Sequence, residues 1–172
     1  TCSHSSSMGL LPQESLRRLA DRLATHEVNI VALPLTNAWL LSRRVRTTPV
    51  QRPLAPISQL QQSGVTVAVG GDNLRDPWFP FGAFDPLGLM SLSSPLTQLA
   101  PWHRLGLSPF TTSAAAVMNL KWDGTIDIGS PADLLLLDSD TWSEALSSPP
   151  NRRVLINGAW ADEMSTLSLD NI

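Results

Sequence analysis

Cysteine is almost absent from this sequence of 172 residues, which contains one, Cys2. An internal disulfide is therefore excluded, and a reducing compartment, the cytoplasm, is the expected location. Long apolar stretches are lacking too: residues 30–35 and 134–137 are far too short to span a membrane, and no basic segment followed by an apolar one indicates a signal peptide. We therefore expect no membrane partner.

Charge of either sign is also scarce, since 16% of the residues are charged and the net charge is -3. No basic cluster is larger than Arg43, Arg44 and Arg46, or the pair Arg152 and Arg153. Nucleic-acid binding is not expected, because it needs a basic face that neutralises phosphates. The hydrophobic content of 42% is too high for a disordered chain. The length fits one ordinary domain with a core.

Apolar and amphipathic segments alternate over the first 88 residues. The apolar runs are rich in β-branched residues and are typical of strands buried on both faces of a parallel sheet. The amphipathic segments are typical of helices that cover such a sheet. This alternation predicts an α/β fold. Helices are predicted over 13–26 and 57–62, and Ser63 and Gly64 end the second of them. Strands are predicted over 28–34 and 65–69, with a loop rich in Pro and Arg over about 35–53.

The pattern changes beyond Gly70. Helices are predicted over 85–98 and 108–119, the second with Ser108 as its N-cap and Pro109 at its first position. The remaining elements are short strands, one small helix with a capping box that begins at Thr141, and a hairpin turn at Asn157 and Gly158. The predicted strands are 124–128, 133–138 and 153–156. The predicted domains are an α/β body over 1–119, a mainly β module over 120–161 and a loose tail over 162–172.

Three polar side chains follow the predicted strands: His4, Asn37 and Asp72. The carboxyl ends of parallel strands meet at one edge of the sheet, where ligands bind in such folds. A histidine and an aspartate at neighbouring strand ends suit metal ligation or proton transfer. Spacing alone leaves the ordinary alternatives open, in which His4 is a capped histidine and Asp72 a turn residue.

Four segments of the sequence carry a resemblance to a known family. They are TCSHSSSM (1–8), ALPLTN (32–37), GGDNLRDPWFP (70–80) and GTIDIGSPADL (124–134) followed by the Asn-Gly pair at 157–158. In this order and at these separations they resemble the cytosine deaminases of the amidohydrolase superfamily. The resemblance covers almost the whole chain.

The resemblance implies the C-terminal part of a (β/α)₈ TIM-like metal-dependent hydrolase barrel, strands six to eight, followed by a small C-terminal β module. A complete barrel needs about 250 residues, and the sequence begins at Thr1 rather than at a methionine, so we expect a fragment. The family's metal-binding histidines of strands one and five have no counterpart here. The full-length enzyme is expected to hold one divalent metal, iron or zinc, and this chain alone is expected to hold none.

The resemblance also assigns roles to four residues. Asp72 is implied as a metal ligand that accepts a proton from the bound water, and His4 as the residue that holds or polarises the resulting hydroxide. Trp78 matches an aromatic residue that lines the substrate pocket, although a core or lid position is an equal alternative. Asn73 stands where the family has an aspartate that contacts the substrate. Asp76, followed by proline, is expected only to shape a loop.

The expected parent activity is hydrolytic deamination of cytosine or a related amino-heterocycle, with the isolated chain inactive. The partners would be this small-molecule substrate and either the missing N-terminal half or further copies of the same chain. Two alternatives remain open. The chain is a non-catalytic remnant or scaffold protein, or it is a half-enzyme that a separate N-terminal chain completes.

Overall fold

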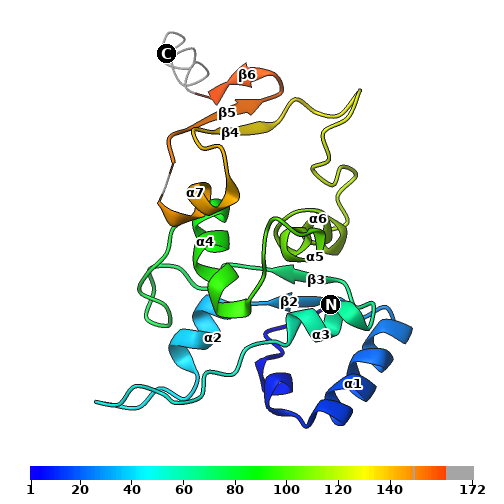
Figure 1. The fold of residues 1–172 in the computed structure, drawn as a ribbon, viewed down its shortest axis with the longest axis vertical. Helices are drawn as coiled ribbons and strands as arrows, with labels where there is room; N and C mark the ends of the chain where they lie inside the picture. The colour runs from blue at the N-terminus through cyan, green and yellow to red at the C-terminus, as the bar shows by residue number, and fades with distance from the viewer. Residues whose placement is uncertain (149, 162–172) are drawn as a thin grey trace. The chain divides into compact units, whose positions relative to one another are not determined.

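The computed structural model describes residues 1–148 and 150–161 and contains two compact units (Figure 1). The first unit is Thr1–Gly124, and the second begins at Thr125. Each has its own three-stranded sheet. The domain limits given above stay a prediction, and the tail predicted over 162–172 lies outside the described residues.

A parallel sheet is the centre of the first unit. Its strands, in spatial order, are β1 (Cys2–Ser3), β2 (Ile30–Ala32) and β3 (Val67–Val69). Ser3 pairs with Val31, and Val31 pairs with Ala68. Both predicted apolar strands are thus present, in shorter form; all three residues of β3 are buried, and in β2 Ile30 and Ala32 are buried while Val31 is partly exposed.

The segment after β2 corrects the prediction of a loop over about 35–53. Its first part is a helix, α2 (Pro34–Leu40), which begins directly after the strand. Pro34 explains the change, because proline has no N–H to donate to a sheet but has a backbone angle suited to the first turn of a helix. The rest of the segment is a loop that contains one isolated bridge, between Arg44 and Thr47.

Helices α1 (Gln13–Thr25) and α3 (Ile57–Gln62) confirm the two predictions made for this region. Gly64 follows α3 with a φ of 87°, a left-handed conformation that glycine adopts without strain and that ends the helix. The apolar residues of these helices join those of the strands in one core. Its fully or almost fully buried members include Leu16, Ala20, Ile30, Ala32, Ile57, Leu60, Val67 and Val69.

The later helices of the first unit agree only in part with the prediction. Helix α4 (Pro86–Thr97) is present, with the side chain of Asp85 capping it by accepting a hydrogen bond from the N–H of Leu87. The single helix predicted over 108–119 is wrong. Thr111, at φ −130° and ψ −102°, separates two short helices, so Ser108 is not an N-cap. The elements here are α5 (Arg104–Leu107), the 3₁₀ helix η2 (Ser108–Phe110) and α6 (Thr112–Val117), and a further 3₁₀ helix, η1 (Ser6–Leu10), follows β1.

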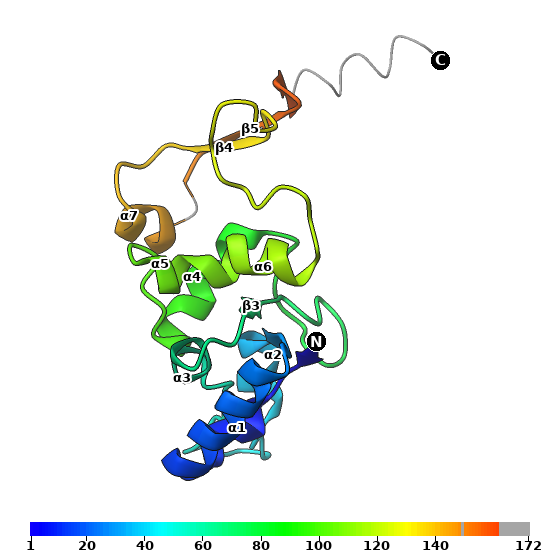
Figure 2. The ribbon, with the colours of Figure 1, turned by 90° about the vertical axis from the view of Figure 1, so that its right-hand side faces the viewer.

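Helices flank the sheet of the first unit. In Figures 1 and 2, α1 lies below the strands, and α4, α5 and α6 lie above β3. Among the described residues β1 and β3 each pair with β2 alone, so the sheet has no partner strand beyond either of them. No helix in the described part of the chain is long and apolar enough to cross a membrane.

The second unit has an antiparallel sheet of β4 (Leu134–Leu137), β5 (Arg152–Ile156) and β6 (Ala159–Trp160). The predicted hairpin turn is confirmed, since Asn157 and Gly158 have φ of 52° and 78°. Helix α7 (Trp142–Ser147) begins as predicted, with Thr141 Oγ1 accepting from the N–H of Glu144 at 3.2 Å.

The strand predicted over 124–128 is wrong. Asp127 accepts a hydrogen bond from the N–H of Ile128 at 2.7 Å, and Gly129 follows with a φ of 88°. An aspartate that bonds its neighbour's N–H and a left-handed glycine form a turn, which competes with strand pairing.

Candidate functional site

The carboxyl edge of the parallel sheet brings together the chain segments that carry the predicted site residues. The N–H of His4 donates to the carbonyl of Val31 at 3.0 Å, and the N–H of Gly70 donates to the carbonyl of Ala32 at 2.9 Å. The ends of β1 and β3 are therefore anchored to adjacent residues of β2, and Asp72 follows two residues beyond Gly70. The structure thus confirms that the strand-end residues belong to one edge of the sheet.

A side-chain hydrogen bond joins two of these strand ends. Asn37, in α2, lies with its Nδ2 2.9 Å from Nδ1 of His4. With the amide nitrogen of Asn37 facing the ring, the amide donates and Nδ1 accepts, which corresponds to the tautomer with the ring proton on Nε2. The Asn37 side chain is 5% exposed. A buried amide thus fixes the orientation of the imidazole and leaves its Nε2–H as a donor.

The backbone at this edge has a conformation that few side chains adopt. His4, Ser5 and Asp72 have φ of 63°, 53° and 59°, in the left-handed region. Each such residue costs on the order of 1–3 kcal/mol, and residues of this kind cluster at functional sites. Seven other described non-glycine residues, Asn157 of the hairpin turn among them, also have a left-handed φ, so this conformation alone does not distinguish His4 and Asp72 as functional residues.

Asp72 and Trp78 are both exposed. The Asp72 carboxylate makes no hydrogen bond or ion pair with any described residue, and none joins it to His4. The side chain of Trp78 is 62% exposed, so it is not a core residue in this chain. Two of the predicted positions of Trp78 therefore remain: the wall of a substrate pocket, or a lid.

The loop after β3 is organised by Asp76. Its Oδ1 accepts from the N–H groups of Trp78 at 2.9 Å and Phe79 at 2.8 Å, and its Oδ2 accepts from Nδ2 of Asn73 at 2.6 Å. The loop-shaping role expected for Asp76 is confirmed. Asn73, expected to contact substrate, has its amide nitrogen engaged by this carboxylate.

The hydrogen bonds to Asp76 lower the pKa of its carboxyl. The N–H of Phe79 has the largest effect, which partial burial opposes, and the groups of Asn73, Trp78 and Leu74 add to the lowering. These donors bind the charged form better than the neutral one. A lowered pKa means that the carboxylate stabilises the folded loop at neutral pH.

We therefore expect the loop over 73–82 to loosen in acid. Because the folded pKa lies below the unfolded value of about 3.9, this stabilisation is present above about pH 4 and is lost as the pH falls through the folded pKa. The protection of the Trp78 and Phe79 amides, measured as the exchange rate relative to the intrinsic rate at each pH, should decrease over that range. In Asp76→Asn this protection should be lower at neutral pH and should no longer change with pH in acid, whereas the same pH profile of protection as in the parent would contradict this role.

The described residues do not form a metal site by themselves. No group of three or more His, Cys, Asp or Glu side chains comes together in the part of the chain that the structure describes. Asp72, with one carboxylate, does not meet the three protein ligands of a catalytic zinc centre. The divalent metal that the sequence resemblance implies therefore does not fit these residues alone.

Sequence reasoning placed Asn37 at a strand end but gave it no role. The ALPLTN segment contains the signal, because a proline at the first position of a helix places the asparagine three residues later in the first turn. Had this helix been predicted, Asn37 would have been expected to lie near the ends of the strands. The contact with His4 also depends on the register of β1 against β2, which cannot be read from the sequence.

Comparisons with known proteins relate this chain to one family. The model of the amidohydrolase family matches residues 1–162. A pterin deaminase of Rhizobium rhizogenes is 32% identical over 156 residues, which are 91% of this chain and 36% of that protein. An N-isopropylammelide isopropyl amidohydrolase of Pseudomonas sp. is 30% identical over 89 residues, 51% of this chain and 22% of that protein.

Solved structures give the same match. The crystal structure of 5-methylcytosine deaminase from Klebsiella pneumoniae with 5-fluorocytosine superposes with a TM-score of 0.78 at 23% identity, over 92% of this chain and 39% of that one. The chain thus matches little more than a third of the pterin deaminase and of the 5-methylcytosine deaminase, and about a fifth of the isopropylammelide amidohydrolase, as a mixed α/β part of a larger fold. With its family model covering almost its full length, the chain belongs to the amidohydrolase family.

Proposed function

We propose that this chain carries part of the active site of a hydrolytic deaminase that acts on a cytosine-like or pterin-like amino-heterocycle. The observation that supports this most is the hydrogen bond from the buried Asn37 to the exposed His4, at the same sheet edge from which the Asp72 loop leaves. The relatives include a pterin deaminase, a 5-methylcytosine deaminase and an N-isopropylammelide isopropyl amidohydrolase. Two of these three names are those of deaminases that act on a heterocycle.

The reaction adds water to the ring carbon that bears the amino group and releases ammonia, so that a carbonyl replaces the amine. Asp72 would accept the proton of the attacking water, because an exposed carboxylate without a partner is available as a general base. His4 would donate its Nε2–H to the attacking oxygen, with Asn37 holding the ring in that tautomer.

Trp78 and Asn73 would contact the substrate. An exposed indole offers a planar ring a stacking surface. Asn73 donates through Nδ2 to Asp76, which leaves its amide oxygen as an acceptor for an N–H of the heterocycle. Trp78 is tied to the same carboxylate through its backbone N–H. Asp76 would therefore position both residues without touching the substrate.

The rest of the site would come from outside this chain. A divalent metal, iron or zinc, would need ligands beyond Asp72, supplied by a longer protein, by a separate N-terminal chain or by another copy. The sheet supports this, since β1 and β3 each have one unpaired edge among the described residues. Such edges are sites for strand addition. A non-catalytic remnant would leave the same edges exposed and would aggregate.

The test is a chimeric protein in which this chain replaces the matching third of the Rhizobium pterin deaminase. We expect ammonia release from pterin or a cytosine, at a rate far above that of the same protein lacking the segment. Substrates without an exocyclic nitrogen should not react. A folded chimera that releases no ammonia from any amino-heterocycle would refute the proposed function.

A further inference from the structure

A pocket lies beside α2, lined by residues that the proposed function does not use. Its volume is about 410 Å³. Arg43, Arg44 and Arg52 are among its lining residues, together with the aromatic residues Trp39 and Phe79. We propose that this pocket binds a small planar organic anion, such as an aromatic carboxylate or phosphate.

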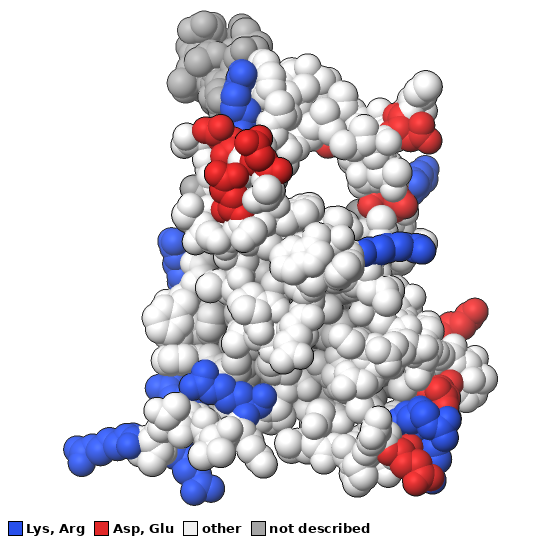
Figure 3. Space-filling model, in the orientation of Figure 1, with Lys and Arg blue, Asp and Glu red and all other residues white. Residues whose placement is uncertain are grey.

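The charge around the pocket has one sign. Four arginines lie between residues 43 and 52, and the sequence has no aspartate or glutamate between Glu27 and Asp72. The described ion pairs of the chain are both on α1, so none engages Arg43, Arg44 or Arg52. Figure 3 shows basic side chains over the loop beyond α2, without acidic ones among them on this face. In a protein of net charge -3, this is a local excess that favours an anion.

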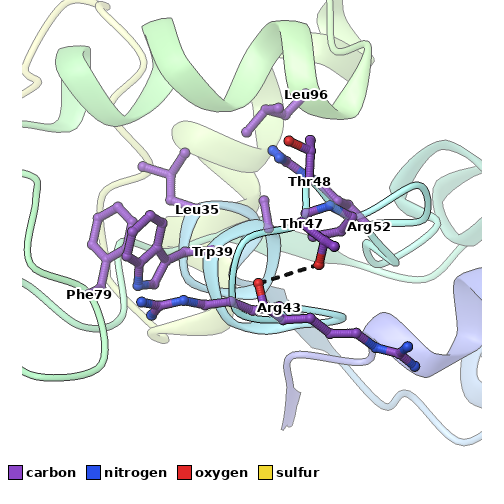
Figure 4. Close-up of a pocket in the computed structure, with 11 residues that line it drawn as sticks. Leu35, Trp39, Arg43, Thr47, Thr48, Arg52, Phe79 and Leu96 are labelled. Atoms are coloured by element: carbon purple, nitrogen blue, oxygen red, sulfur yellow. Dashed lines mark hydrogen bonds between the residues drawn. The ribbon is translucent and has the colours of Figure 1, made fainter.

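The geometry of the arginines suits carboxylate or phosphate. The guanidinium of Arg43 lies over the Trp39 ring, 4.5 Å from its centroid, and this contact restrains the side chain. A restrained planar fork loses little freedom when it binds two oxygens at once. The Thr47 hydroxyl donates to the Arg44 carbonyl at 3.5 Å, which helps to close the loop that carries these groups (Figure 4).

The aromatic side of the pocket selects the rest of the ligand. Trp39 and Phe79 both line the pocket, with Leu35 and Leu96 farther along the wall in Figure 4. Phe81 supports both rings by edge contacts, at 5.0 Å from Trp39 and 5.7 Å from Phe79 between centroids. Such a wall favours a flat apolar body, and the cavity volume is within the range of about 300–1,000 Å³ of small-molecule sites. A concave site of this size fits a small molecule better than a macromolecule.

Benzoate and benzamide test the proposal, because they have the same shape and differ in charge. Each is titrated into the ¹⁵N-labelled 172-residue protein, and the indole N–H signal of Trp39, assigned with Trp39→Phe, reports on the pocket. We expect benzoate to saturate in the millimolar range and benzamide to bind at least about fivefold more weakly, as expected for exposed charge pairs. Raising the ionic strength should weaken benzoate alone.

Matched arginine variants distinguish binding of benzoate in the pocket from its general attraction to a positively charged loop. Arg44→Gln and Arg52→Gln should each weaken benzoate by about threefold, and Arg46→Gln, in the same loop but outside the lining, should not. Equal binding of benzoate and benzamide, or equal effects of the Arg46 and Arg44 variants, would overturn the proposal. Tighter binding of inorganic phosphate than of benzoate would overturn the requirement for a planar ligand.

Discussion

Asp72→Asn in the chimeric deaminase is expected to lower kcat by about 10²–10⁴-fold, the contribution of a positioned general base. An amide has the shape of the carboxylate but does not accept a proton at neutral pH. The Asp72 side chain is exposed and makes no described contact, so the variant should fold and melt as the parent does. The measurement is the rate of ammonia release, with circular dichroism as the check on folding.

Asp138→Asn is the matched control, because it removes one carboxylate from the second unit. It should leave the rate of ammonia release unchanged. A chimera with Asp72→Asn that is as active as the control would show that Asp72 is a turn residue, the ordinary alternative that the sequence allows. Loss of folding in Asp72→Asn would contradict the exposed position of the side chain.

Asn37→Asp is expected to move the ring proton of His4 from Nε2 to Nδ1. A carboxylate can only accept, so it takes the Nδ1–H in place of the amide that donates to Nδ1. The Nε2 then loses its proton and cannot donate to the attacking oxygen. The ¹⁵N chemical shifts of the imidazole report the tautomer directly, and kcat of the chimera should fall by about 10²-fold or more, as for loss of a positioned proton donor.

The tautomer of His4 is first measured in the chimera without the substitution. An imidazole with its proton on Nδ1 before any substitution would mean that the amide oxygen of Asn37 faces His4, which contradicts the assignment made here. Asn151→Asp, exposed in the second unit, provides the control for an added negative charge. It should change neither the ¹⁵N shifts of His4 nor kcat.

Caps, turn residues and glycine stops in the sequence correctly predicted several elements that begin or end at them. The helix over 57–62 has a glycine stop, the hairpin at Asn157 has its turn residues, and the start of α7 has its cap. The errors occur where a neighbouring signal competes. Pro34 begins a helix inside the predicted loop, and Asp127 with Gly129 makes a turn where alternating isoleucines favour a strand.

The part of the candidate site that lies at the ends of the strands was predictable from the sequence. Parallel strands place the residues that follow them at one edge, and so His4 and Asp72 could be grouped from spacing. The contact between Asn37 and His4 depends on the register of β1 and β2. The arginine pocket was not predictable, because α2, the following loop, the loop after β3 and α4 each contribute part of its lining.

The most direct test of the account is to measure ammonia release by the isolated 172-residue protein beside the chimera, at equal concentration and with zinc or iron added. We expect no turnover and no stoichiometric metal for the isolated chain, since its described residues form no group of metal ligands. For the chimera we expect turnover and about one bound metal. Turnover by the isolated chain, or a folded chimera that binds metal without turnover, would contradict the claim that this chain supplies part of a deaminase site.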